Sequence, residues 1–94
     1  MANRTTVIDR LDRMIARLSK PLLPSDIRDG WSEDGRKAIL EVLERLRTRL
    51  QSDEPLTEAE KRLSISRGMD TWGVLAGDLL EEGAEVSNQL RELK

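Results

Sequence analysis

The sequence predicts an all-α protein: a small antiparallel bundle of three to four helices, with a break or kink near Gly68. We expect one domain that spans residues 1–94. Apolar residues recur every three or four positions over three long stretches, which is the spacing of one face of a helix. Proline and glycine separate the first two of these stretches. A chain of 94 residues has room for one core of this kind.

The composition excludes several kinds of chemistry. The chain has no cysteine and no histidine, which excludes disulfides, thiolate catalysis, histidine acid–base catalysis and nitrogen-ligated metals. We therefore expect no enzyme and no cofactor. The only aromatic residues are Trp31 and Trp72, so the core must be aliphatic and chiefly leucine. The sequence shows no apolar leader and no membrane span, so we expect a cytoplasmic protein.

The net charge of −2 is unevenly distributed along the chain. Residues 1–30 carry six basic and four acidic side chains, whereas residues 53–94 carry five basic and ten acidic side chains. A basic front and an acidic back indicate that the two halves pack against each other or against a second copy.

The first helix is expected from Thr5 to Ser19, with Asn3, Thr5 or Thr6 as its cap. One broad apolar stripe supports it: Val7, Ile8, Leu11, Met14, Ile15 and Leu18. One flank of this helix carries three basic residues: Arg10, Arg13 and Arg17. That flank is interpreted as a solvated surface, with a phosphate-binding row as the alternative. A third hypothesis is that it faces an acidic flank of the last helix, formed by Asp78, Glu82 and Glu85.

A connection and a second helix follow. Pro21 and Pro24 end the first helix. The connection is too apolar for a free loop, and we expect its apolar residues to cover one end of the bundle or, if exposed, to bind a partner. These residues are Leu22, Leu23, Ile27 and Trp31. The second helix is expected from Ser32, a favourable N-cap, to about Gln51. Its core seam is Ile39, Leu43, Leu46 and Leu50.

A capping box marks the next helix start, with Thr57 as the cap and Glu60 three residues later. Apolar residues before and after Gly68 point to different sides of a continuous helix, so we expect a break there. Asp70 or Thr71 would then cap the last helix. The alternative is an unbroken helix from Thr57 to the C-terminus, which would need partners on both sides.

The last helix, residues 70–94, is predicted to have two inward faces. The first is a core stripe formed by Trp72, Leu75, Leu79, Val86, Leu90 and Leu93. The second is an interaction face bordered by Trp72 and formed by Gly73, Gly77, Leu80, Ala84 and Ser87. Glycine inside a helix costs about 1 kcal/mol relative to alanine, and close approach of a neighbouring backbone is the usual compensation. We therefore expect this helix to contact neighbours on two sides. The alternative is that the glycines mark local fraying or a break.

Two Glu-x-x-Glu pairs are the strongest candidates for metal chemistry: Glu41 with Glu44, and Glu82 with Glu85. The run from Glu81 to Glu85 resembles part of the first acidic motif of the all-helical nucleotide pyrophosphohydrolases. This resemblance implies a magnesium-dependent enzyme, but no second Glu-x-x-Asp motif follows. We therefore expect no metal site.

The opening NRTTV, followed by a helix and later by SEDGRKAILEVLERL, resembles the ribbon-helix-helix antitoxins. The resemblance implies a short strand that reads the major groove and a dimer formed by two helices. The connection between the two segments is longer here than in that family. The sequence thus favours a non-catalytic protein–protein interaction module, regulatory, adaptor or inhibitor in type and homodimeric. The alternatives are a DNA-binding antitoxin-type regulator and a metal-dependent pyrophosphohydrolase-like enzyme.

Overall fold

The computed structural model describes residues 3–52, 54–62 and 65–93. Within these ranges the chain forms helices and no strand. The helices are α1 (Arg4–Leu18), α2 (Pro24–Arg28), α3 (Glu33–Gln51), α4 (Glu58–Lys61), α5 (Ile65–Thr71) and α6 (Asp78–Glu92). The all-α prediction is therefore confirmed.

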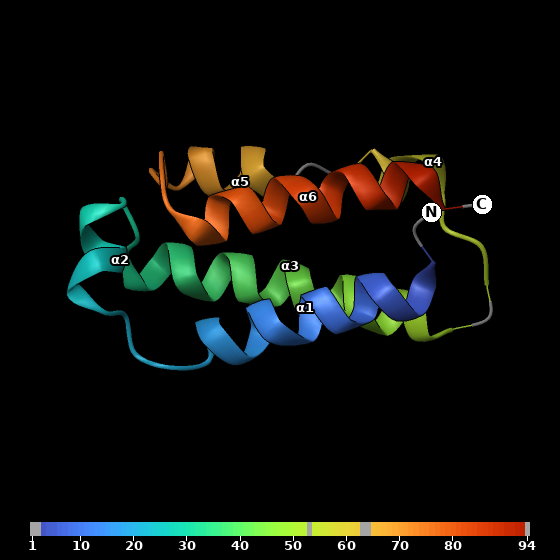
Figure 1. Cartoon of the computed structure of the whole chain (residues 1–94), viewed down its shortest axis with the longest axis horizontal. Coiled ribbons are helices and arrows are strands. Elements are labelled where there is room, and N and C mark those ends of the chain that lie inside the picture. The colour runs from blue at the N-terminus through green and yellow to red at the C-terminus, as the bar shows by residue number, and fades with distance from the viewer. Residues whose placement is uncertain (1–2, 53, 63–64, 94) are drawn as a thin grey trace.

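The chain forms a bundle with up-down-up-down topology, in which α1, α3, the α4–α5 segment and α6 alternate in direction (Figure 1). The helix α1 packs against α3 and α6, and the short helix α5 closes the ring by packing against α3 and α6. The molecule measures 38 × 21 × 20 Å, and both chain ends lie at the same end of the bundle. No helix in the described ranges is long and apolar enough to cross a membrane. The prediction that the last helix contacts neighbours on two sides holds for α6 itself, because α1 and α5 both pack against it. It does not hold for Gly73 and Gly77, which lie in the loop before α6.

Side-chain caps start α1 and α3, at Asn3, one of the three predicted candidates, and at Ser32, as predicted. The Asn3 Oδ1 atom accepts a hydrogen bond from the Thr6 N–H at 2.8 Å, and the Ser32 Oγ atom accepts one from the Gly35 N–H at 3.1 Å. Each cap satisfies a backbone donor that the first turn of a helix leaves unpaired.

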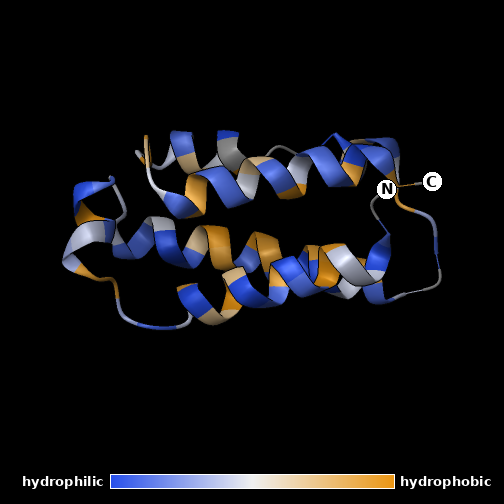
Figure 2. Cartoon of the chain, in the orientation of Figure 1, coloured by the Kyte–Doolittle hydropathy of each residue, from blue (hydrophilic) through white to orange (hydrophobic). Residues whose placement is uncertain are grey.

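The core is aliphatic, as predicted, and runs the length of the bundle (Figure 2). From α1 and α3 it receives Val7, Leu11, Met14, Leu18, Ile39, Leu43, Leu46 and Leu50. From the rest of the chain it receives Trp31, Leu56, Ile65, Met69, Val74, Val86, Leu90 and Leu93. Burial of this apolar surface is the main stabilising contribution.

A capping box at the start of α4 is the local feature that the sequence predicts most closely. The Thr57 Oγ1 atom accepts a bond from the Glu60 N–H, and Glu60 Oε1 accepts one from the Thr57 N–H at 2.8 Å. Arg49 of α3 binds the same carboxylate with an Nε–Oε2 distance of 2.6 Å. The Arg49 guanidinium, together with the Thr57 N–H, lowers the pKa of Glu60 to about 2. The box thus anchors α4 to α3.

The C-terminal half is interrupted on both sides of the predicted break at Gly68, because α4 ends at Lys61 and α5 ends at Thr71. Gly68 lies inside α5, and the chain leaves the helix only after Thr71. Asp70 and Thr71 end α5 instead of capping the last helix, which begins at Asp78 after Gly77. An unbroken helix from Thr57 is also wrong, because residues 72–77 form a loop. Tertiary contacts decide this position, because the loop must meet the α2–α3 connection described below.

Ser87 of α6 belongs to the predicted second inward face, and at this residue the face is buried against α5 of the same chain instead of being open to a partner. It is 2 % exposed, and its Oγ atom accepts a hydrogen bond from the Ile65 N–H at 2.9 Å. The same hydroxyl donates to the Gly83 carbonyl at 2.8 Å. Ser87 therefore satisfies a backbone donor in the first turn of α5 from a neighbouring helix. The absence of a side chain at Gly83 brings α5 close, since an added Cβ would lie 3.0 Å from Ile65 Cγ2.

Replacement of Ser87 by alanine is expected to lower the free energy of unfolding by about 2 kcal/mol, because a buried Ile65 N–H loses its acceptor. Urea denaturation followed by circular dichroism measures this change. The neighbouring Asn88 is exposed, and Asn88→Ala serves as the control with an expected change within about 0.5 kcal/mol. An equal effect of both substitutions would contradict the role assigned to Ser87.

Candidate functional site

Four large apolar side chains are exposed at the end of the bundle opposite the chain termini. Leu23 and Ile27 belong to the α2 segment and are 51 % and 61 % exposed. Trp72 and Leu75 belong to the α5–α6 loop and are 44 % and 72 % exposed. We call these four residues the end patch. Large apolar side chains exposed at one end of a bundle are typical of a surface that binds another molecule.

The connection after α1 both covers the bundle and contributes to this patch. Trp31 is 4 % exposed and seals the core, as predicted, and Leu22 is half-buried against it. Leu23 and Ile27 face solvent instead, so for them the prediction of a covering role is wrong. The reason is the short helix α2, which turns its other side toward α1.

An ion pair between Arg17 and Asp26 holds α2 against α1. The Asp26 carboxylate accepts two hydrogen bonds from the Arg17 guanidinium, at 2.6 and 3.1 Å, and a third from the Leu23 N–H at 2.8 Å. Burial by itself would raise the pKa of Asp26, but the bonds from Arg17 and Leu23 outweigh it and leave this pKa below its ordinary value. The carboxylate is therefore ionised in the folded protein at neutral pH and fixes the first turn of α2.

Contacts between two loops position the other half of the end patch. The Leu75 N–H donates to the Asp29 carbonyl at 3.1 Å, which ties the α5–α6 loop to the α2–α3 connection. Gly30 adopts a φ of 108°, and a Cβ at this position would lie 1.9 Å from the Gly73 carbonyl oxygen. Gly77 adopts a φ of 105°, and its Cβ would lie 2.3 Å from Asp29 Oδ2. The two backbones meet where neither has room for a side chain.

The exposure of Trp72 and Leu75 corrects the predicted core stripe. Because α6 begins only at Asp78, both residues lie in the preceding loop, and the buried stripe of α6 retains Val86 and Leu90. The signal that could have found the loop is the pair of glycines around Val74, Leu75 and Ala76, which marks a turn as readily as a close helix contact.

The predicted interaction face is divided among three environments. Gly73 and Gly77 lie in the α5–α6 loop, and Ser87 lies in the interior. Leu80 and Ala84 are half-buried and line an open groove of about 480 Å³ between α5 and α6. Leu75 lines the same groove, so this α5–α6 groove extends the end patch along the bundle.

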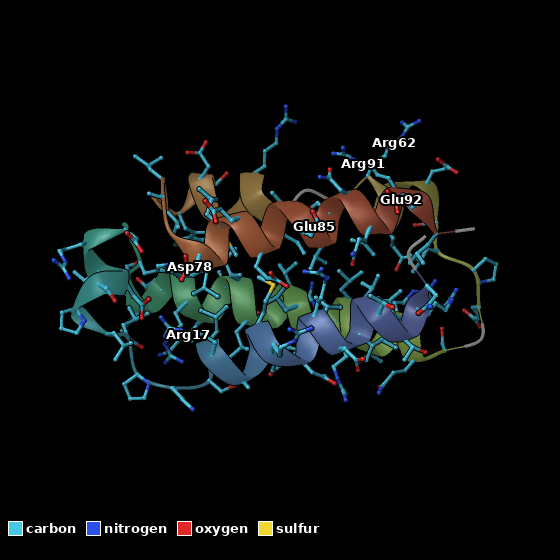
Figure 3. The ribbon with its side chains drawn as sticks, in the orientation of Figure 1. Arg17, Arg62, Asp78, Glu85, Arg91 and Glu92 are labelled. Carbon is cyan, nitrogen blue, oxygen red and sulfur yellow. The ribbon has the colours of Figure 1, made fainter. Side chains whose placement is uncertain are left out.

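The charged flanks meet only in part. Arg10 of α1 binds Glu82 of α6 at 2.9 Å, as the third hypothesis predicts, whereas Arg17 binds Asp26. Arg13, Asp78 and Glu85 form no ion pair within residues 3–52, 54–62 and 65–93. Figure 3 shows Arg17 and Asp78 on α1 and α6 near the same end of the bundle, with Glu85 farther along α6.

Neither family resemblance gains support from the geometry. Glu41 pairs with Arg45 of its own helix and Glu82 pairs with Arg10, and among the described residues no three acidic side chains are arranged to hold a metal ion. The segment that resembles the antitoxin strand is helical from Arg4 onward. No protein-family model, curated protein or solved structure is significantly similar to this chain.

The acid stability of the protein tests the position of α2. Since the pKa of Asp26 is lowered on folding, its ion pair stabilises the protein above the ordinary carboxyl pKa, and this contribution is lost as pH falls below that value. We expect Asp26→Asn to lower the free energy of unfolding by about 2 kcal/mol at about pH 6 and by less at about pH 2. Urea denaturation at both values measures the difference. The exposed Asp9, as Asp9→Asn, is the control; a penalty for Asp26→Asn that does not change with pH would contradict the assignment.

The loop junction has its own test. Gly30→Ala is expected to cost at least about 2 kcal/mol, because the new Cβ meets the Gly73 carbonyl and the positive φ disfavours any side chain. Gly68→Ala is the matched control, since α5 has room for a Cβ there and helix propensity predicts a gain of about 0.5–1 kcal/mol. Thermal melts of both variants measure these changes. Tolerance of Gly30→Ala would refute the close approach of the two loops.

Proposed function

We propose that this protein is a small non-catalytic protein–protein interaction module, regulatory, adaptor or inhibitor in type, that acts as a homodimer in the cytoplasm. The observation that carries the proposal is the end patch, where Ile27 and Leu75 are the most exposed large apolar residues in the described chain. Leaving these side chains in water costs free energy that association recovers, at roughly 25 cal/mol per Å² of apolar surface covered.

The charge around the end patch favours a second copy of the chain as the partner. Arg28 of α2 and Asp70 of α5 are both exposed, and neither forms an ion pair within the described residues. One half of the patch therefore carries a free basic residue, and the other half carries a free acidic one. In a twofold symmetric dimer, α2 of one copy would cover the α5–α6 loop of the other, and Arg28 would approach Asp70 at both symmetry-related positions.

The two alternatives have less support. A DNA-binding regulator would use the basic flank of α1, but Arg10 and Arg17 are already engaged by Glu82 and Asp26. Only Arg13 of that flank is free of an ion pair with a described residue, and one arginine does not form a phosphate-binding row. The enzyme alternative requires converging carboxylates, which the described residues do not supply.

Sedimentation equilibrium of the pure protein tests the proposal. The natural chain is expected to be dimeric at micromolar concentration, and Ile27→Ser combined with Leu75→Ser is expected to weaken the dimer by at least about tenfold. Both side chains are mostly exposed in one copy, so the circular dichroism spectrum and the fold of the variant should be unchanged.

Ala59→Ser is the control, because Ala59 is an exposed residue of α4 at the other end of the bundle. A strictly monomeric natural chain would reject the dimer. A dimer that survives the double substitution would reject the end patch as its interface. Binding to duplex DNA that weakens steeply with salt would favour the antitoxin-type regulator instead.

A further inference from the structure

A cavity of about 360 Å³ lies between α1, the α2 segment and the first turns of α6. Its size is at the lower end of the range for small-molecule sites. Met14 and Leu79 contribute apolar lining, and charged residues of both signs surround it. It is separate from the end patch, because none of the four residues of that patch lines it.

Three arginines follow one another along α1, and the middle one, Arg13, lines the cavity. Arg10 forms an ion pair with Glu82 at 2.9 Å. Because the helices are antiparallel, one turn farther along α1 brings Arg13 to the level of Asp78, one turn earlier in α6. Both residues line the cavity, yet they form no ion pair. One turn farther along α1, Arg17 forms an ion pair with Asp26.

Other unpaired polar groups line the same cavity. Trp31 is 4 % exposed, and its indole N–H donates no hydrogen bond to a described residue. This nitrogen retains contact with solvent, so its N–H is free to bind a ligand. The Asp29 side chain, beside Gly77, likewise has no hydrogen bond or ion pair with a described residue. The cavity therefore presents two free donors, at Arg13 and Trp31, and two free carboxylates, at Asp29 and Asp78.

The geometry points to a binding site for a small zwitterion of the amino-acid class. Its carboxylate accepts hydrogen bonds from the Arg13 guanidinium and the Trp31 indole N–H, and its ammonium group donates to Asp78 and Asp29. A short apolar side chain then packs against Met14 and Leu79. Both charges of the ligand take part, because its carboxylate meets Arg13 and its ammonium group meets Asp78, two exposed groups that water solvates in the free protein. This site does not depend on the proposed dimer.

Nitrogen–proton NMR spectra provide a direct test, because the chain has only two tryptophans and hence two indole signals. The probes are glycine, L-leucine, L-glutamine and γ-aminobutyrate. At least one is expected to shift the Trp31 indole signal saturably and to leave that of Trp72 in place; a spectrum of Trp72→Phe assigns the two. Arg13→Gln and Asp78→Asn should each weaken binding by at least about tenfold, the loss expected for one charge-assisted hydrogen bond.

Controls separate this site from nonspecific binding of charge. Arg45→Gln and Glu85→Gln remove exposed residues that do not line the cavity, and they should leave affinity unchanged. Isoamylamine and isocaproate each lack one charge of leucine and should bind at least about tenfold more weakly than leucine if leucine binds. No shift with any probe would overturn the inference. An equal response to isoamylamine, or unchanged affinity in Arg13→Gln, would also overturn it, since the site would then bind cations alone.

Discussion

The contact between the α2–α3 connection and the α5–α6 loop is the constraint on which the rest of this structure depends. Two backbones meet there without side chains between them: Gly30 lies against the Gly73 carbonyl, and the Leu75 N–H binds the Asp29 carbonyl. This contact decides where α5 ends and where α6 begins. It also brings the two halves of the end patch together, one from each side of the junction.

Electrostatic contacts help to specify how the helices are arranged, because the leucine-rich core by itself does not. A leucine-rich core fills space but allows several helix arrangements of similar energy. Arginines linking distant segments reduce that choice: Arg4 donates to the carbonyls of Leu50 and Ser52, Arg36 donates to the carbonyl of Leu18, and Arg47 of α3 binds Asp12 of α1. These contacts are partly buried, and each contributes modestly to stability. Together they favour one register of α1 on α3.

The predictions succeeded where a signal is local and periodic. The caps at Asn3, Ser32 and Thr57 and the core positions of α1 and α3 follow from residue type and spacing alone, and all are confirmed. The predictions failed where one residue type can serve two structural roles. Gly73 and Gly77 were interpreted as sites of close helix packing, but they lie in a loop and have positive φ. Ser87 was assigned to an interaction face with a partner, but it accepts a hydrogen bond from the first turn of α5 in the same chain. Neither assignment could be reached without knowing what lies opposite in space.

The sequence by itself determined that this protein is an all-α antiparallel bundle with an aliphatic core, because hydrophobic periodicity and helix caps act within a few residues of each other. The tertiary structure decided between alternatives that the sequence left open: Trp31 is buried while Ile27 and Leu75 are exposed, and Arg10, but not Arg17, pairs with the acidic flank of α6. It also opens a cavity beside Asp78. Each of these features depends on contacts between segments distant in the chain. Such contacts are selected by the total energy of the packed molecule, and no local pattern in the sequence encodes them.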